Sequence, residues 1–143
     1  MEKLDSIFFY HLEKSIKSYR QYAQSILLEQ GHRLTIDQWM VLKVMQENPD
    51  VTQNALAELV FKDKASVTRI IKILVDTKHL KRAAHESNRK LNKFVITAIG
   101  DKAIKSIFPT IKKNRKKALS GLTISEVKIA KKVFVKIISN CKK

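Results

Sequence analysis

The chain has 143 residues, which is long enough for one domain with its own hydrophobic core. Its hydrophobic fraction of 44% is typical of a folded globular protein, and no apolar run approaches the roughly 18 residues that a membrane span requires. The single cysteine, Cys141, excludes an internal disulfide and a cysteine-based zinc site, which fits a reducing, cytoplasmic location. The N-terminus places acids before a short apolar cluster, so we expect no secretory signal.

The charge is strongly basic and unevenly distributed. The chain has 29 basic and 13 acidic residues, a net charge of +16. Residues 1–61 hold 6 basic and 8 acidic residues, whereas residues 62–143 hold 23 and 5. This asymmetry favours a polyanionic partner, most often nucleic acid. A lysine-rich surface that only keeps the chain in solution is the alternative.

Helical spacing dominates the first half of the chain. Apolar residues recur at intervals of three and four over about residues 5–30, and Gly31 ends this predicted helix. Thr35 and Gln38 form a capping-box pattern that opens a second helix, which ends before Pro49. A short helix capped by Thr52 and another over about residues 64–77 follow. Residues 52–77 therefore predict two helices joined by a short turn.

The periodicity then becomes that of strands. The segments "LKRAA" and "KFVIT" alternate and flank the polar "HESNRKLN", which predicts a hairpin with a basic loop. Helical spacing returns in two long segments, with a bend expected at Pro109 and a second capping box at Thr123 and Glu126. The predicted fold is mainly α with one small β hairpin, in a single domain over residues 1–143.

The predicted helix over residues 64–77 has two unlike faces. One face is apolar and predicts contact with the core; it consists of Val67, Ile70, Ile71 and Leu74. On the other side, Arg69 can donate two hydrogen bonds to a guanine edge and Lys72 can reach a phosphate. Small residues at its start would let the backbone approach base edges; they are Ala65, Ser66 and Thr68. An ordinary amphipathic helix with solvated lysines is the alternative interpretation.

The hairpin strengthens the DNA-binding interpretation. A helix-turn-helix followed at once by a hairpin is the winged form, and Arg89 and Lys90 at its tip can follow phosphates or enter a minor groove. The candidate DNA-binding residues are Thr52, Gln53, Lys64, Ala65, Ser66, Thr68, Arg69, Lys72, Arg82, Ser87, Asn88, Arg89 and Lys90.

Over nearly its whole length the sequence resembles the MarR-type winged helix-turn-helix regulators. The matching motifs are "LTIDQWMVL", "ALAELV" with "ASVTRIIKIL", "HLKR" and "VITAIG". The resemblance implies a winged helix-turn-helix over residues 35–97, with the helix-turn-helix at about 52–77 and the wing at about 80–97. It assigns residues 5–30 and 98–141 to dimerisation helices and implies that Arg89 reaches the minor groove.

Three positions depart from the family pattern. Asn88 stands where the family usually has an acid that orients a neighbouring arginine. His79 stands where a glycine usually precedes the first wing strand, and it must tolerate or avoid a left-handed backbone. Phe61 lies near the place of the tight-turn glycine found in many helix-turn-helix motifs.

The resemblance also implies a homodimer that presents two recognition helices to a pseudo-palindromic operator. The first and last helices offer more apolar surface than one small domain obviously needs, although a monomer could bury much of it. The candidate interface residues are Leu4, Ile7, Phe8, Val127, Phe134, Ile137 and Ile138.

A small aromatic or anionic effector is a further possibility that the resemblance raises. Aromatic residues at helical spacing are more often part of a core, but five residues are candidates for an effector pocket: Tyr10, His11, Tyr19, Tyr22 and Trp39. The basic segment "KKNRKK", residues 112–117, is expected to be a solvated helix end away from the duplex. We expect no cofactor and no metal.

An enzyme is not expected, because the sequence lacks a glycine-rich phosphate loop, a nucleophile elbow and a His-Glu metal spacing. The favoured hypothesis is a sequence-specific transcriptional regulator that binds duplex DNA as a homodimer and acts as a repressor. The alternatives are a basic nucleic-acid-binding protein of low specificity, nucleoid- or RNA-associated, and a winged module that has lost DNA binding.

Overall fold

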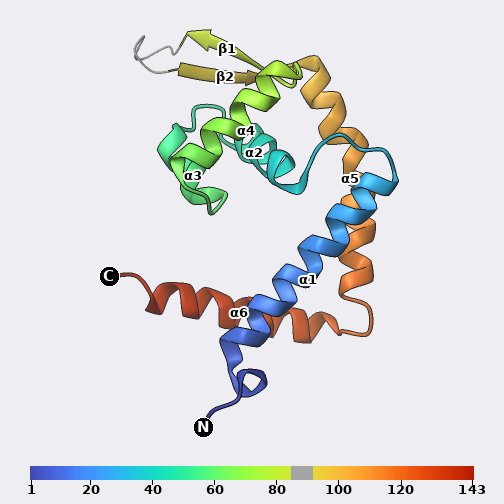
Figure 1. Cartoon of the computed structure of the whole chain (residues 1–143), viewed down its shortest axis with the longest axis vertical. Helices are drawn as coiled ribbons and strands as arrows, with labels where there is room; N and C mark the ends of the chain where they lie inside the picture. Colours follow the sequence, from blue (N-terminus) through green and yellow to red (C-terminus); the bar gives the residue numbers. More distant parts are fainter. Residues whose placement is uncertain (85–91) are drawn as a thin grey trace.

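Two long helices connect a helical unit with a β hairpin, at one end of the molecule, to the N-terminus and the last helix toward the other (Figure 1). The computed structural model describes residues 1–84 and 92–143. The described elements, in chain order, are a 3-10 turn (Leu4–Ser6), α1 (Phe8–Glu29), α2 (Ile36–Glu47), α3 (Gln53–Leu59), α4 (Lys64–Asp76), β1 (Leu80–Ala84), β2 (Asn92–Ile96), α5 (Ala98–Ala118) and α6 (Ile124–Asn140). The mainly α fold with one hairpin, as predicted from the sequence, is confirmed.

The predicted helix starts are confirmed at atomic level. Both capping boxes form, at Thr35 with Gln38 and at Thr123 with Glu126, so each side chain accepts a backbone N–H that the helix itself leaves unpaired. Thr52 caps α3 by accepting from the N–H of Ala55. The start of the first helix was predicted wrongly, because Ile7 has an extended backbone that separates the 3-10 turn from α1.

Two left-handed residues end the helices of the winged unit. Phe61 has φ 61° two residues after the end of α3, near the place of the tight-turn glycine found in many helix-turn-helix motifs. Lys78 has φ 67° after α4, so His79 avoids the left-handed backbone that its position in the family pattern suggested. In both turns a backbone N–H reaches back to the last helical turn, from Lys62 to Ala57 O and from His79 to Leu74 O. These bonds define where each helix stops.

The hairpin pairs antiparallel and lies against the end of α4. Leu80 is opposite Ile96, and Ala84 is opposite Asn92. Gly100, in the first turn of α5, lies so close to this junction that an added Cβ would overlap the carbonyl oxygen of His79. A larger residue at Gly100 would therefore push α5 away from the hairpin.

A single core holds the winged unit together and extends along α5. It contains Val41 and Leu42 of α2, Leu56 of α3, and Leu80 of β1. From the other helices it takes Leu27, Val67, Ile71, Leu74, Ile104, Ile107 and Ile111. The buried side of α5 thus packs on α1 and α2, and α5 continues through Pro109 without interruption.

The last helix differs from the others, because none of the residues of α6 is buried in the chain. In the view of Figure 1 it runs across the molecule below the winged unit, from the lower end of α5 to the C-terminus beneath α3. Among the described residues, no helix combines the length and the apolar character needed to cross a membrane.

Candidate nucleic-acid interface

The core fixes which side of α4 faces water. Val67, Ile71 and Leu74 are at most 3% exposed, whereas Arg69 and Lys72 on the opposite side are exposed. Ala65 and Thr68 are also exposed, and Ser66 is half-buried. The structure therefore brings the candidate residues of α4 onto one outward side, directly after the turn that follows α3.

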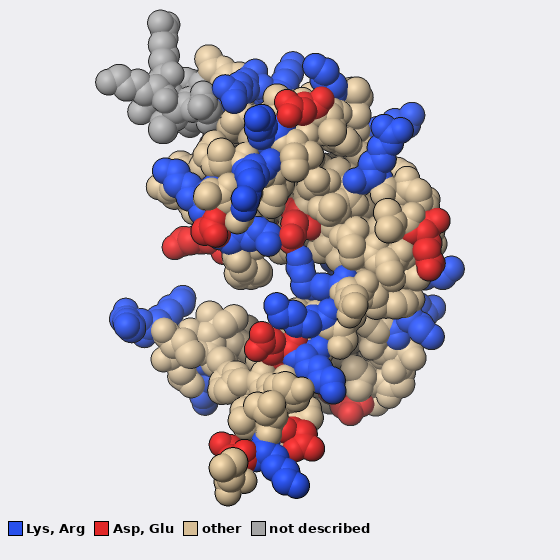
Figure 2. Space-filling view, in the orientation of Figure 1, with Lys and Arg blue, Asp and Glu red and all other residues tan. Residues whose placement is uncertain are grey.

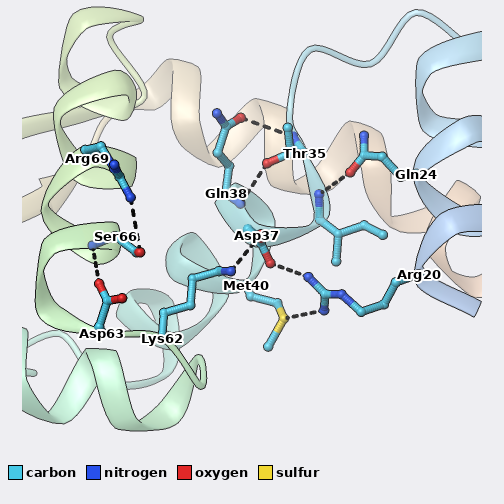
Figure 3. A network of polar contacts seen from close by, with 11 residues as sticks. Arg20, Gln24, Thr35, Asp37, Gln38, Met40, Lys62, Asp63, Ser66 and Arg69 are labelled. Atoms are coloured by element: carbon cyan, nitrogen blue, oxygen red, sulfur yellow. Dashed lines mark hydrogen bonds and ion pairs between the residues drawn. The ribbon is translucent and has the colours of Figure 1, made fainter. Parts of the chain in front are cut away.

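Asp63 organises the start of this helix. Its carboxylate accepts a hydrogen bond from the backbone N–H of Ser66 at 2.7 Å, and the Ser66 hydroxyl in turn accepts from Arg69 at 3.3 Å (Figure 3). The backbone and side chain of Ser66 hold the pKa of Asp63 below its ordinary value, with help from the charges of Arg69 and Lys62. One of the five Arg69 donors is used in this contact, so the others remain for a partner.

The other candidates of the helix-turn-helix have more local roles. Thr68 is exposed and donates its hydroxyl to the Lys64 carbonyl at 2.9 Å. Thr52 is the exposed cap of α3, and Gln53 is half-buried beside it. These contacts stabilise the helices and leave a polar, predominantly basic outer surface.

The wing is described only in part. Arg82 is exposed on β1, with its guanidinium 5.9 Å from the centre of the Phe94 ring. The candidates Ser87, Asn88, Arg89 and Lys90 lie outside the described residues.

An ion-pair network that the sequence did not predict joins this interface to α1. Asp37, in the first turn of α2, pairs with Arg20 of α1 and, at 3.2 Å, with Lys62 of the turn before α4 (Figure 3). Arg20 also approaches the sulfur of Met40 at 3.7 Å. One carboxylate thus links the long helix α1 to the turn that positions α4. The partners are 17 and 25 positions from Asp37, a spacing that no helical pattern reveals.

The five candidates for an effector pocket do not lie together. Tyr19 and Trp39 line a cavity of about 130 Å³ between α1, α2 and α5, with Arg20 and Arg115 in the same wall. Arg115 places its guanidinium 5.8 Å from the Trp39 ring centre. Tyr10, His11 and Tyr22 are not among the residues that line this cavity, and the His11 ring instead contacts the carbonyl oxygen of Asp5 at 2.5 Å.

The candidate dimer residues are accessible in the single chain. Leu4, Phe8, Phe134 and Ile138 are 39–63% exposed, and Ile7, Val127 and Ile137 are half-buried. Further apolar side chains of the last helix are also exposed; these are Ile124, Ile129, Val133 and Val135. The apolar surface of α1 and α6 therefore lacks a cover within one chain.

Comparison with known proteins identifies the winged unit. Residues 33–91 match the family model of the MarR family. These residues form a MarR family domain. The resemblance inferred from the motifs of α2, α3 and α4 is thereby confirmed.

Relatives of the MarR family domain agree in sequence and in fold. The HTH-type transcriptional regulator YybA of Bacillus subtilis is 31% identical over 97 residues, which are 65% of this chain and 62% of YybA. The crystal structure of the S. aureus MepR–DNA complex superimposes with a TM-score of 0.83 at 17% identity, covering 96% of this chain and 99% of MepR. The structure of Bordetella bronchiseptica BpsR, whose DNA binding is regulated by 6-hydroxynicotinic acid, superimposes with a TM-score of 0.86 at 16% identity, covering 99% of both chains. The structural similarity extends beyond the matched domain to almost the whole chain.

The cap at Asp63 leads to a pH-dependent prediction. Because its folded-state pKa is lowered, ionised Asp63 stabilises the protein above the unfolded value of about 3.8, and this contribution disappears as the pH falls through the folded-state pKa. In Asp63→Asn the cap remains but the charge is gone. We expect the wild type to exceed the variant in free energy of unfolding at neutral pH, and the difference to shrink as the pH falls below about 3.8 in urea titrations.

Asp76→Asn is the matched control, since Asp76 is an exposed carboxylate on the same helix that caps no helix start. The assigned role of Asp63 would be contradicted if the loss in free energy of unfolding in Asp63→Asn did not change with pH. It would also be contradicted if both variants showed the same dependence of this loss on pH.

Proposed function

We propose that the chain is a sequence-specific, DNA-binding transcriptional regulator that places α4 in the major groove of duplex DNA. The observation that carries this proposal is the outward side of α4, where Thr68, Arg69 and Lys72 stand opposite a fully buried side. Arg69 would read a base edge, and Lys72 would contact phosphate. The MarR family domain and the crystallisation of the structural relative MepR as a DNA complex support DNA binding by this fold.

Several residues would position the chain on the phosphate backbone rather than read the sequence. Thr52, Gln53 and Lys64 lie at the starts of α3 and α4, where their polar side chains and the charge of Lys64 could contact phosphates. Arg82 on β1 would extend this contact toward the wing, whose tip residues we assign to the minor groove. Phosphate contacts of this kind fix the position and orientation of the protein on the duplex, and α4 then supplies the sequence preference.

We infer that the regulator is a homodimer joined through α1 and α6. A monomeric protein rarely leaves a whole helix without a buried residue, and the exposed apolar residues of α6 would be covered by a second copy. A two-fold axis would present two α4 helices to a pseudo-palindromic site, with half-sites about one helical turn apart.

We further infer that the output is repression relieved by a small aromatic or anionic effector. The cavity lined by Tyr19, Trp39, Arg20 and Arg115 combines aromatic surface with two guanidinium groups, which suits a planar carboxylate. Its 130 Å³ is below the roughly 300–1,000 Å³ of drug-sized sites, so the ligand would be small. The regulation of BpsR by 6-hydroxynicotinic acid is a precedent in a protein of the same fold.

A basic nucleic-acid-binding protein of low specificity is the second candidate function. The net charge of +16 favours it, because phosphate neutralisation alone gives substantial, salt-sensitive binding.

The role of Arg69 separates the two functions. In Arg69→Ala, we expect affinity for a preferred duplex obtained by random-sequence selection to fall by about 1–3 kcal/mol, or roughly 5- to 150-fold, because alanine cannot donate hydrogen bonds to a base edge. Affinity for a shuffled duplex should change much less. Fluorescence anisotropy at one fixed salt concentration measures both.

Lys43→Ala is the matched control for charge. Lys43 is a cation of α2, not of α4, and it pairs with Gln46 and Glu47. If Arg69→Ala reduces affinity equally for the preferred and the shuffled duplex, Arg69 does not read a base edge, and the low-specificity function is favoured.

The dimer is tested by Phe134→Glu. A buried carboxylate at the two-fold contact should weaken dimerisation by roughly 30-fold or more, as expected for an interface anchor, while the winged unit stays folded because α6 lies outside its core. Size-exclusion chromatography with light scattering gives the mass of each form. Lys132→Glu is the control on the same helix, and a wild type that stays monomeric at micromolar concentration would refute the dimer.

A further inference from the structure

Most of the positive charge lies outside the winged unit that the proposed function uses. Residues 33–97 hold 12 basic and 7 acidic residues, a net +5, whereas residues 98–143 hold 13 and 2, a net +11. Figure 2 shows basic side chains over the lower half of the molecule as well as over the winged unit. Docking of α4 on DNA therefore leaves the larger part of the charge unexplained.

On α5 the lysines share one side of the helix. Most of them recur at intervals of three, four, seven or eleven residues, the spacings that return to one side of an α-helix, and Lys113 and Lys117 each directly follow another member. All of them are exposed; they are Lys102, Lys105, Lys112, Lys113, Lys116 and Lys117. We call this set the α5 lysine face. The buried residues Ile104, Ile107 and Ile111 occupy the opposite side, against α1 and α2, so the packing of α5 directs its lysines to solvent.

Few carboxylates neutralise this face. Within residues 1–84 and 92–143, Lys105 is the one member that pairs with an acid, Asp101, at 3.0 Å. Lys112 lies with its ammonium 5.5 Å from the centre of the Phe108 ring, an arrangement that leaves its charge in place. A cationic surface of this density repels itself, and an external polyanion would relieve that repulsion.

The shape of the face indicates which polyanion it fits. From Lys102 to Lys117 a helix rises by about 22 Å. One strand of duplex DNA carries a phosphate for each 3.4 Å of helix axis, so a segment of that length offers roughly six phosphates to six lysines. An anionic bilayer suits the face less well, because an interfacial helix inserts its apolar side and the apolar side of α5 is already in the core.

We propose that the α5 lysine face is a second, sequence-independent docking surface for the phosphate backbone of double-stranded nucleic acid, separate from the outward side of α4. It would hold a neighbouring duplex segment while α4 engages its site. The six lysines are exposed, and the side of α5 opposite them is buried in the core. Most of α5 extends below the winged unit that contains α4 (Figure 1). The surface acts through charge alone, so it does not depend on sequence recognition by α4.

The test compares two quadruple variants of the full chain with the same change in charge. Lys112, Lys113, Lys116 and Lys117 are replaced by Gln in one, and Lys128, Lys131, Lys132 and Lys136 of α6 in the other. Each is measured by anisotropy on one random-sequence duplex across a salt series. We expect the slope of log affinity against log salt to become shallower by roughly 3–4 in the α5 variant, about 0.9 for each phosphate that the variant no longer neutralises, and by less than about 1 in the α6 variant.

The same pair of substitutions in an Arg69→Ala background separates this proposal from the proposed function. If wild type and Arg69→Ala show no sequence preference but the α5 substitutions still reduce the salt slope, the regulator function is wrong and the second docking surface is retained. Equal effects of the α5 and α6 variants would show a bulk charge effect and overturn the proposal. An α5 variant with the same salt slope as the wild type would overturn the proposal as well. So would an α5 variant that loses binding to phosphatidylserine vesicles while its affinity for DNA is unchanged. Circular dichroism verifies that each variant is folded.

Discussion

Burial of one side of α4 is the constraint on which the rest of the structure depends. Val67, Ile71 and Leu74 pack into the core that α2, α3 and β1 share, so the helix cannot rotate without exposing them to water. Burial of each such side chain is worth roughly 1.5–3 kcal/mol, far more than any single exposed hydrogen bond on the other side. The outward direction of Arg69 and Lys72 is therefore a consequence of core packing. The same packing holds the outward side of α4 in a fixed position.

The Asp37 network extends this constraint from the winged unit to the long helices. Asp37 is bound by Arg20 from α1 and by Lys62 from the turn before α4. The same Arg20 lines the cavity that we assign to an effector. An anion in that cavity would compete with Asp37 for Arg20, and the balance of these contacts would reach the turn that positions α4 through Lys62. Partly exposed ion pairs are individually weak, so such coupling would be modest, within the few kcal/mol usual for allosteric regulators.

The sequence predicted elements that depend on local chemistry and missed those that depend on distant contacts. Capping boxes at Thr35 and Thr123 are local patterns, and both form. The apolar spacing of α4 correctly predicted its buried side. By contrast, the left-handed residue before β1 proved to be Lys78, because the α4 terminus closes one position earlier than the family pattern implied. The five aromatic candidates are dispersed along α1 and α2, and only the tertiary packing of α5 selects Tyr19 and Trp39 as neighbours of a cavity.

The central claim is that α4 reads a DNA sequence from a two-fold symmetric protein. Random-sequence selection of duplexes with the purified full chain, followed by sequencing of the retained pool, tests it most directly. The account predicts one enriched inverted repeat with half-sites about 10–10.5 base pairs apart, bound at least about 10³-fold more tightly than the starting pool. A pool that retains protein but shows no enriched sequence would contradict sequence recognition by α4.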